Sequence, residues 1–304
     1  MKRFLNWKIL FLVMLIAVAI FRPYAFFYGL QRGSLYSLVA LPLALILGIV
    51  GLLNLAHGDF LTLGLYLGYV LFNQLHFDPI FSVILIGPFL FLVGLAVYKS
   101  TVERVLKSHH LNLLLITFGI SITLVELVNL LWTSRPRNVY VPYAARSVNI
   151  LGISVGAYEF LYVAAAFLVL LTIMFILKKT RFGQAAFAVG QNPKGAAIVG
   201  INVRMVYTIT FSLATAMIAV SAALMMPRVS IFPHVGGPFT MKSFCLTAMA
   251  GLGNLPGILI SGITLGIAEA IVQSIPGYSG WSDLVFFGVL ILVIALRAYR
   301  RSER

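Results

Sequence analysis

The chain is dominated by apolar runs that are long enough to cross a lipid bilayer. A hydrocarbon core of about 30 Å is spanned by roughly 20 helical residues, and uncharged runs of this order recur along the sequence. Ten runs are candidates, at residues 9–21, 33–56, 60–75, 79–98, 111–134, 160–177, 205–226, 239–253, 255–275 and 281–296. The pattern predicts an all-α fold, a polytopic transmembrane helical bundle.

Four of these runs, at 9–21, 60–75, 239–253 and 281–296, are short or interrupted. Broken or re-entrant helices are tolerated at membrane depth where protein or a water-filled cavity covers the freed backbone groups. We therefore expect about 8 to 10 spans, with broken or re-entrant segments, in a single transmembrane domain over residues 1–304.

Composition excludes a soluble enzyme of this length. Apolar residues make up 61% of the chain and charged residues 10%, whereas a soluble fold would expose far more charge. The 22 Lys and Arg residues outnumber the 8 Asp and Glu residues. In a membrane protein, the positions of the excess basic residues indicate which loops lie on the cytoplasmic side, and the excess does not indicate a nucleic-acid partner. The single cysteine cannot form an intrachain disulfide or a multi-thiolate metal site.

The basic residues indicate which ends of the spans lie inside. If all ten runs cross with the N-terminus inside, 15 of the 22 basic residues fall on the inner side, as the positive-inside rule requires. Both termini are then cytoplasmic. Residues 1–21 also have the basic start and apolar run of a signal peptide. We favour an uncleaved N-terminal anchor helix over residues 1–22, because Phe21, Arg22 and Pro23 are a poor mature start.

Two connecting segments are longer than a turn. Residues 134–158, on the outer side, carry Arg135, Arg137 and Arg146 and either meet a soluble partner or form a solvated connector. Residues 178–204, on the inner side, contain five basic residues and no acid. An alanine-rich helical pattern lies on both sides of Asn192 and Pro193 in this inner segment.

The chain lacks the motifs of a self-sufficient enzyme. It has no Gly-x-x-x-x-Gly-Lys-Ser/Thr phosphate-binding loop, no His-Glu-x-x-His, no Gly-x-Ser-x-Gly and no clustered Cys and His ligands. We expect no catalytic residues, no metal site and no cofactor bound by this chain. If ATP hydrolysis powers this protein, ATP and Mg must be bound by partner subunits.

Glu126 is a charged residue inside an apolar run. A charge in hydrocarbon costs at least about 2.5 kcal/mol and usually faces protein or a cavity. Glu126 shares a helical stripe with Gly119, Thr123 and Asn129, so this face must point at protein or water. Structural hydrogen bonding and a role in a pathway both fit.

Glu269 lies in a second stripe, one that indicates helix packing. Gly262, Gly266 and Ala270 place a small residue at every fourth position beside Glu269, and this spacing allows another helix to approach closely.

The sequence Asn54-Leu-Ala-His57-Gly58-Asp59 interrupts two apolar runs with polar groups and a glycine. Such a break is typical of a discontinuous helix near a translocation path, and a hydrogen-bonded helix connection would need the same residues. No nucleophile or ligand set accompanies His57 and Asp59, so a catalytic pair is disfavoured.

Together these motifs resemble the permease family of branched-chain amino acid ABC importers, specifically the shorter of its two permease types. The resemblance is carried by residues 51–59, by Thr180-Arg-Phe-Gly183 with residues 190–197 and 200–202, and by residues 251–257 with 266–270. It implies that residues 178–204 form a cytoplasmic coupling loop that docks on the ATPase through Ala196, Ala197 and Gly200. Small side chains at Ala196 and Gly200 would permit close docking. Phe187 departs from the pattern, since family members commonly have Arg there.

The resemblance also implies an assembly and a cargo. The partners would be a second permease subunit, two ATPase subunits and an external substrate-binding protein in the plasma (inner) membrane, and the cargo would be leucine, isoleucine or valine. Related permeases move urea, short amides or other amino acids. A membrane-embedded enzyme using His57 and Asp59, or a self-sufficient secondary transporter using Glu126 or Glu269, are the alternatives from other classes.

Overall fold

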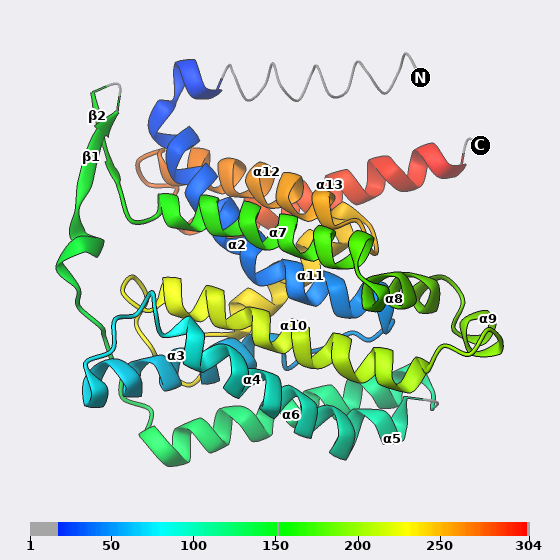
Figure 1. The fold of residues 1–304 in the computed structure, drawn as a ribbon. Coiled ribbons are helices and arrows are strands. Elements are labelled where there is room, and N and C mark those ends of the chain that lie inside the picture. Colours follow the sequence, from blue (N-terminus) through cyan, green and yellow to red (C-terminus); the bar gives the residue numbers. More distant parts are fainter. Residues whose placement is uncertain (1–17, 107, 151, 303–304) are drawn as a thin grey trace.

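The computed structural model describes residues 18–106, 108–150 and 152–302 and is mostly helical (Figure 1). Its longer helices are α2 (Pro23–Ile49), α3 (His57–Leu75), α4 (Val83–Val97), α6 (His110–Trp132), α7 (Phe160–Lys179), α8 (Arg181–Gln191), α10 (Val203–Met225), α11 (Gly237–Ala250), α12 (Leu255–Gln273) and α13 (Ser282–Ser302). Shorter elements are a π-helical turn at Tyr98–Val102, α5 (Glu103–Val105), α9 (Pro193–Ile198) and 3₁₀ turns at Pro142–Ala145 and Ser279–Trp281.

Six helices in the described residues are long and apolar enough to cross a membrane. They are Pro23–Ile49, Val83–Val105, Leu111–Trp132, Phe160–Lys179, Val203–Met225 and Leu255–Gln273. The all-α membrane class is therefore confirmed, and the expected 8 to 10 spans are not. The short α11 has 14 residues and extends about 21 Å, less than a full crossing. The anchor helix predicted over residues 1–22 lies outside the described residues, apart from a helical stretch at 18–21.

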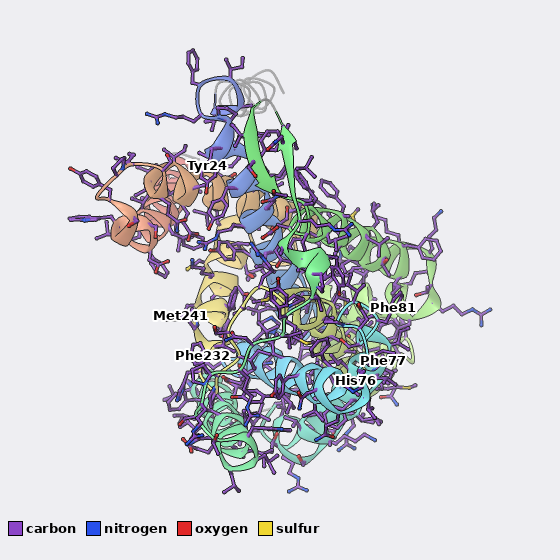
Figure 2. The ribbon with its side chains drawn as sticks, turned by 90° about the vertical axis from the view of Figure 1, so that its left-hand side faces the viewer. Tyr24, His76, Phe77, Phe81, Phe232 and Met241 are labelled. Carbon is purple, nitrogen blue, oxygen red and sulfur yellow. The ribbon has the colours of Figure 1, made fainter. Side chains whose placement is uncertain are left out.

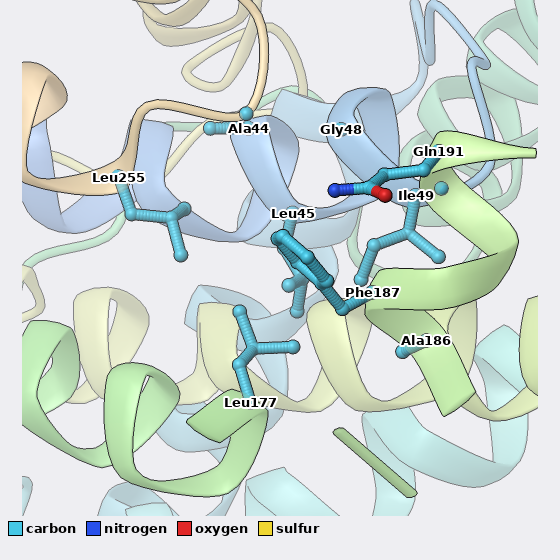
Figure 3. Close-up of a pocket in the computed structure, with 11 residues that line it drawn as sticks. Ala44, Leu45, Gly48, Ile49, Leu177, Ala186, Phe187, Gln191 and Leu255 are labelled. Carbon is cyan, nitrogen blue, oxygen red and sulfur yellow. The ribbon is translucent and has the colours of Figure 1, made fainter. Parts of the chain in front are cut away.

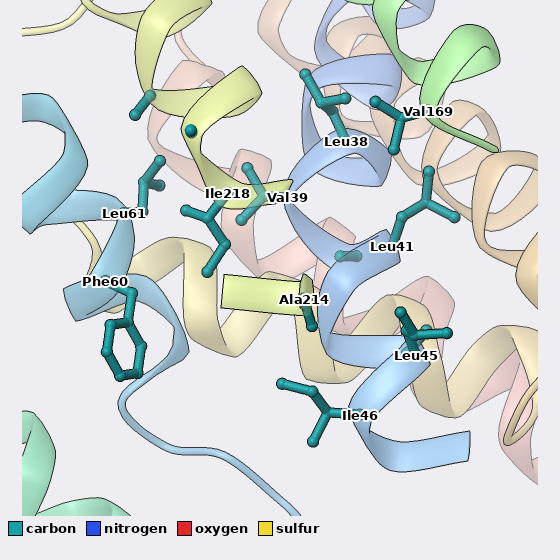
Figure 4. Packing of buried hydrophobic residues seen from close by; sticks show 14 of the residues in the cluster. Leu38, Val39, Leu41, Leu45, Ile46, Phe60, Leu61, Val169, Ala214 and Ile218 are labelled. Atoms are coloured by element: carbon teal, nitrogen blue, oxygen red, sulfur yellow. The ribbon is translucent and has the colours of Figure 1, made fainter. Parts of the chain in front are cut away.

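The α2 helix forms the centre of the bundle. Every residue from Gly33 to Ile46 is buried, so this helix has no polar face and is covered all round. Figure 4 shows its side chains between α3, α10 and α7: Val39 and Ile46 lie on the side of Ala214 and Ile218, and Leu38 lies near Val169. This stretch of α2 thus forms the shared core for its neighbours.

Glycines let α12 pack directly on the backbone of α2. A Cβ atom on Gly33 would lie 2.7 Å from Ile263 Cα, and one on Gly266 would lie 2.6 Å from Gly33 Cα. Both distances are too short for any side chain, so only hydrogen fits at the crossing. The Gly262 and Gly266 positions therefore face α2, together with Gly29 and Gly33.

The connection between α2 and α3 differs from the predicted run 33–56. The α2 helix ends at Ile49, and residues 50–56 form a non-helical return before α3 begins at His57. Gly51 has φ +72°, a conformation that glycine adopts without strain. The side-chain oxygen of Asn54 accepts the Ala56 amide at 3.2 Å. The break therefore begins earlier than hydrophobicity alone indicates.

The connector at residues 133–159 contains a two-stranded antiparallel hairpin that was not predicted. Its strands are β1 (Ser147–Ile150) and β2 (Ile153–Gly156). Gln31 Nε2 donates to the Gly156 carbonyl at 2.9 Å, and the Tyr143 hydroxyl donates to Asp78 at 2.9 Å. Burial, followed by the hydrogen bond to Asp78, raises the pKa of Tyr143. The connector is thus fastened to the bundle and is not a loose loop.

The α8 and α9 helices lie at the opposite end of the bundle from this hairpin (Figure 1). The predicted helical pattern on both sides of Asn192 and Pro193 is confirmed. Side-chain caps begin the helices here: Thr180 accepts from the Gly183 amide, Asn192 from Gly195 and Asn202 from Met205, each at 3.0 Å.

Candidate functional site

The helix break brings Asn54, His57, Gly58 and Asp59 together in a buried position. His57 Nε2 lies 2.7 Å from the Val39 carbonyl oxygen, so this nitrogen donates its proton to an acceptor in the middle of α2. Asp59 stands in the first turn of α3, where the positive end of the helix dipole favours a carboxylate.

Hydrogen bonds join the start of α3 to the start of α11. The Gly58 amide donates to Thr240 Oγ1 at 2.8 Å, and the Gly236 amide donates to Thr62 Oγ1 at 3.1 Å. Two helix N-termini therefore meet inside the protein, and each supplies a threonine that satisfies the other. This arrangement is a hydrogen-bonded helix connection, and His57 Nδ1 has no hydrogen-bond partner among the described residues.

The polar stripe of α6 points away from the rest of the chain. Gly119, Thr123 and Glu126 are exposed, and a Cβ atom on Gly119 would meet nothing within 4 Å. Within the part of the chain that the structure describes, the hydrogen bond of the Glu126 carboxylate comes from its own helix, from Asn129 Nδ2 at 3.5 Å. A carboxylate on an outward face within an apolar span requires water or another protein.

The short α11 also has an exposed face. Met241 is 60% exposed, and Figure 2 places it with Phe232 along one edge of the molecule. The α11 helix packs on α2, α3, α12 and α13 with its other faces. Its free side, like the α6 stripe, is left uncovered by the described residues.

The three residues expected to dock on the ATPase lie in or after α9, but they do not share one surface. Ala196 is buried against the bundle, whereas Ala197 and Gly200 are exposed. Gly200 has φ +88°. The Ile201 amide bonds to the Ala196 carbonyl at 3.0 Å and the Gly200 amide to Ala197 at 3.1 Å, which is a Schellman cap. Glycine is thus required here by the end of α9, whatever docks outside it.

Large apolar side chains are exposed on α8 and at the end of α9, among exposed polar residues such as Arg181, Gln184 and Lys194. Ile198 is 86% exposed, Val199 75% and Phe187 61%. A cavity of about 140 Å³ lies between α8, the ends of α2 and α7 and the start of α12, and Figure 3 shows Phe187 beside Leu45 at its edge. Large apolar side chains exposed to this extent are typical of surfaces that contact another molecule.

The sequence did not reveal a cluster of charges built around Glu269. This carboxylate is 2% exposed and accepts hydrogen bonds from Arg32 at 3.0 Å, Tyr36 at 3.1 Å and Gln273 at 3.2 Å. Lys242 Nζ lies 3.4 Å away. Glu269 therefore has several donors from three helices, and its position in the small-residue stripe of α12 is only part of its environment.

Lys242 extends this cluster to α13. Its ammonium lies 3.1 Å from Asp283 and 3.0 Å from the Tyr36 hydroxyl, and it sits over the ring of Phe286 at 5.0 Å. The positive charges of Arg32 and Lys242 equal in number the negative charges of Glu269 and Asp283. The available signal was the pairing rule for charges within the membrane, but the partners are up to 237 residues apart, so sequence spacing could not connect them.

No group of three or more His, Cys, Asp or Glu residues that could hold a metal ion occurs in the part of the chain that the structure describes.

Comparison with known proteins identifies the class to which this bundle belongs. The model of the family described as branched-chain amino acid transport system / permease component matches residues 25–295, and the chain belongs to this family. It is a transport component and not an enzyme, and the resemblance inferred from the motifs is confirmed.

Individual relatives cover nearly the whole chain. The high-affinity branched-chain amino acid transport system permease protein LivH of Escherichia coli is 29% identical over 88% of this chain and 91% of its own. The corresponding protein BraD of Pseudomonas aeruginosa is 28% identical over 88% and 92%. The galactose/methyl galactoside import permease protein MglC of Salmonella typhimurium is 22% identical over 100% and 98%. No solved structure matches.

Proposed function

We propose that this chain is the membrane-spanning permease subunit of an ATP-driven, binding-protein-dependent importer of branched-chain amino acids. Family membership supports the permease role, and the names of relatives such as LivH and BraD support the cargo. The observation that carries the ATP-driven mechanism is the exposure of Phe187, Ile198 and Val199 on and beside α8 and α9. Such a surface needs a partner.

The partner at this surface would be one of two ATPase subunits. Its closure on ATP would press on α8 and α9, with Ala196, Ala197 and Gly200 in the contact region. The backbone of α8 approaches α2 closely: a Cβ atom on Gly190 would lie 2.9 Å from the Gly48 carbonyl oxygen, and one on Gly48 3.0 Å from Gly253 Cα. A displacement of α8 would thus reach both α2 and the α11–α12 turn through rigid backbone contacts.

The α6 stripe with Glu126 would face the second permease subunit or the water of the pathway between the two subunits. This assignment explains why a charged residue is exposed in a membrane-spanning helix. The helix break at residues 54–59 would position α3 and α11 around the same pathway. The hairpin connector would lie outside, toward the external binding protein, with both termini in the cytoplasm of a cell whose plasma (inner) membrane holds the complex.

The rival functions lack support from the site geometry. Glu269 is fully engaged by donors, including Arg32 and Lys242, so it is poorly placed to carry protons as a secondary transporter would require. His57 donates to a backbone carbonyl, and its other ring nitrogen has no hydrogen-bond partner among the described residues. Neither observation favours an ion-driven carrier or a membrane-embedded enzyme.

Cargo is tested by a panel of radiolabelled substrates in the reconstituted complex of permeases, ATPases and binding protein. We expect uptake of leucine, isoleucine or valine. The purified permease alone should bind leucine weakly, because the external protein captures the cargo and the membrane path must release it. Transport of urea, short amides, galactose or other amino acids with none of leucine would keep the permease role and contradict the cargo.

A further inference from the structure

Two cavities lie along the seam between α4 and α10, and we call them together the α4–α10 groove. The cavity nearest α8 and α9 has a volume of about 600 Å³ and is lined by Leu95, Lys99, Glu103, Arg204, Met205 and Ile209, among others. Farther along the same two helices lies a second cavity of about 450 Å³, lined by Gly87, Pro88, Phe91, Leu92 and Ala216. The first cavity is partly charged, and the second is apolar.

The two cavities lie in line along one stripe of each helix. Pro88, Leu92, Leu95 and Lys99 succeed one another at helical spacing, as i, i+3 and i+4 neighbours do on one face. The 11 residue steps from Pro88 to Lys99 span roughly 16 Å at about 1.5 Å per step. This length is half of a hydrocarbon core of about 30 Å, which is the thickness of one leaflet.

The charges at the wide end favour an anion. Arg204 forms an ion pair with Glu103, whereas Lys99 is exposed and makes no ion pair with any described residue. Two cations against one carboxylate leave a net charge of about +1 at the mouth of the groove. Basic pockets between helices on the cytoplasmic side of a membrane attract anionic head groups.

The apolar end opens toward lipid. Ile84 is 63% exposed, Leu85 46%, Phe89 41% and Leu92 61%, so the outer surface of α4 beside the groove is the kind that contacts acyl chains. An acidic side chain of the ATPase would account for the charged end alone. A ligand with an anionic head and a chain about one leaflet long accounts for both ends.

We propose that the α4–α10 groove binds one anionic phospholipid, with its phosphate between Lys99 and Arg204 and an acyl chain lying past Leu92 toward Pro88. The lipid would cover the seam between α4 and the first half of α10, directly after the α9 segment. This proposal requires only that the groove lies in a bilayer, so lipid binding and leucine transport are measured separately and can fail separately.

The test uses the full-length purified permease, exchanged into mixed micelles with phosphatidylglycerol or phosphatidylcholine and examined by native mass spectrometry. We expect one retained phosphatidylglycerol and no comparable retention of phosphatidylcholine. Lys99→Glu breaks no ion pair seen here and reverses one charge, so it should weaken phosphatidylglycerol retention roughly thirtyfold. Leu92→Trp, which fills the apolar end, should weaken it without altering charge.

Lys178→Glu is the matched control, because Lys178 is an exposed lysine at the end of α7 and does not line the groove. It should retain phosphatidylglycerol as the wild type does. Equal losses in Lys99→Glu and Lys178→Glu would show diffuse attraction and overturn the site, as would unchanged retention in both Lys99→Glu and Leu92→Trp. Loss of ATPase binding by Lys99→Glu with phosphatidylglycerol retention intact would assign the charged end to the ATPase instead.

Discussion

Single glycines decide how closely α2 and α12 approach. Gly33→Ala would place a methyl group 2.7 Å from Ile263 Cα, and overpacking of this kind costs about 1–3 kcal/mol. We expect a lower melting temperature of the purified subunit in detergent. Gly288→Ala is the matched control, since a Cβ atom there meets nothing within 4 Å. It should be neutral or slightly stabilising in helix α13, and equal melting temperatures for the two variants would refute the close crossing.

The carboxylate of Glu269 is expected to affect the stability of the fold by a comparable amount. Glu269→Gln keeps the size of the side chain but leaves Arg32 without its carboxylate and Lys242 with Asp283 alone. Removing one partner of a buried pair costs about 3 kcal/mol or more, so the free energy of unfolding should fall by that order. Glu126→Gln, on the exposed stripe, should change it by less than about 0.5 kcal/mol. Similar losses at both positions would contradict the buried cluster.

At the scale of single residues, the sequence predicts which residues are structurally important. It predicts their contacts and backbone conformations less well. The stripe of Gly262 and Gly266 on α12 was expected to face another helix, and the structure places it on α2. Gly200 was expected to be small for docking, whereas its φ of +88° shows that it also ends α9. The partners of Glu269 come from helices far apart in the chain, and only the fold brings them together.

The α8–α9 pair is the element on which the coupling depends. Ile198→Glu places a charge in the proposed contact with the ATPase, so we expect loss of ATPase stimulation and of ATPase co-purification. The melting temperature of the subunit alone should not change, because Ile198 is 86% exposed. Val148→Glu, at an exposed position in the hairpin at the other end of the molecule, should leave ATPase stimulation as it is. Full stimulation of the Ile198→Glu complex would exclude this surface.

The α6 stripe is tested by removing its charge. If Glu126 faced only lipid, Glu126→Leu would relieve a cost of at least about 2.5 kcal/mol and leave transport intact. We expect instead that Glu126→Leu impairs pairing with the second permease or uptake by the complex. Leu131→Ala, at an exposed apolar position of α6, should have little effect on either. Normal assembly and uptake in Glu126→Leu would contradict the proposal that the stripe faces the second permease subunit or the pathway.

Elements were predictable where their apolar runs are long and uninterrupted. Residues 111–134, 160–177 and 255–275 correspond closely to α6, α7 and α12. The apolar run 33–56 did not reveal where α2 ends, because Gly51 and Asn54 turn the chain within a stretch that is still apolar. The hairpin at residues 147–156 lacked a distinctive pattern, and its position depends on tertiary bonds such as that from Gln31 to Gly156.

At the scale of the whole molecule, the chain has a coherent core around α2 and three surfaces that a single subunit leaves incomplete. These are the α6 stripe with Glu126, the exposed apolar side chains of α8 and α9, and the exposed side of α11. An importer assembled from several subunits would cover each of them. The chain itself, by its family, supplies the permease component.

The most direct test of the central claim is to measure which energy source, ATP or an ion gradient, supports leucine uptake in proteoliposomes. We expect uptake by the complete complex only with internal ATP and the loaded binding protein outside, at a rate that follows ATP hydrolysis, and no uptake by this chain alone under a proton or sodium gradient. Gradient-driven leucine uptake by the isolated chain, in the absence of ATP and partner subunits, would contradict the account.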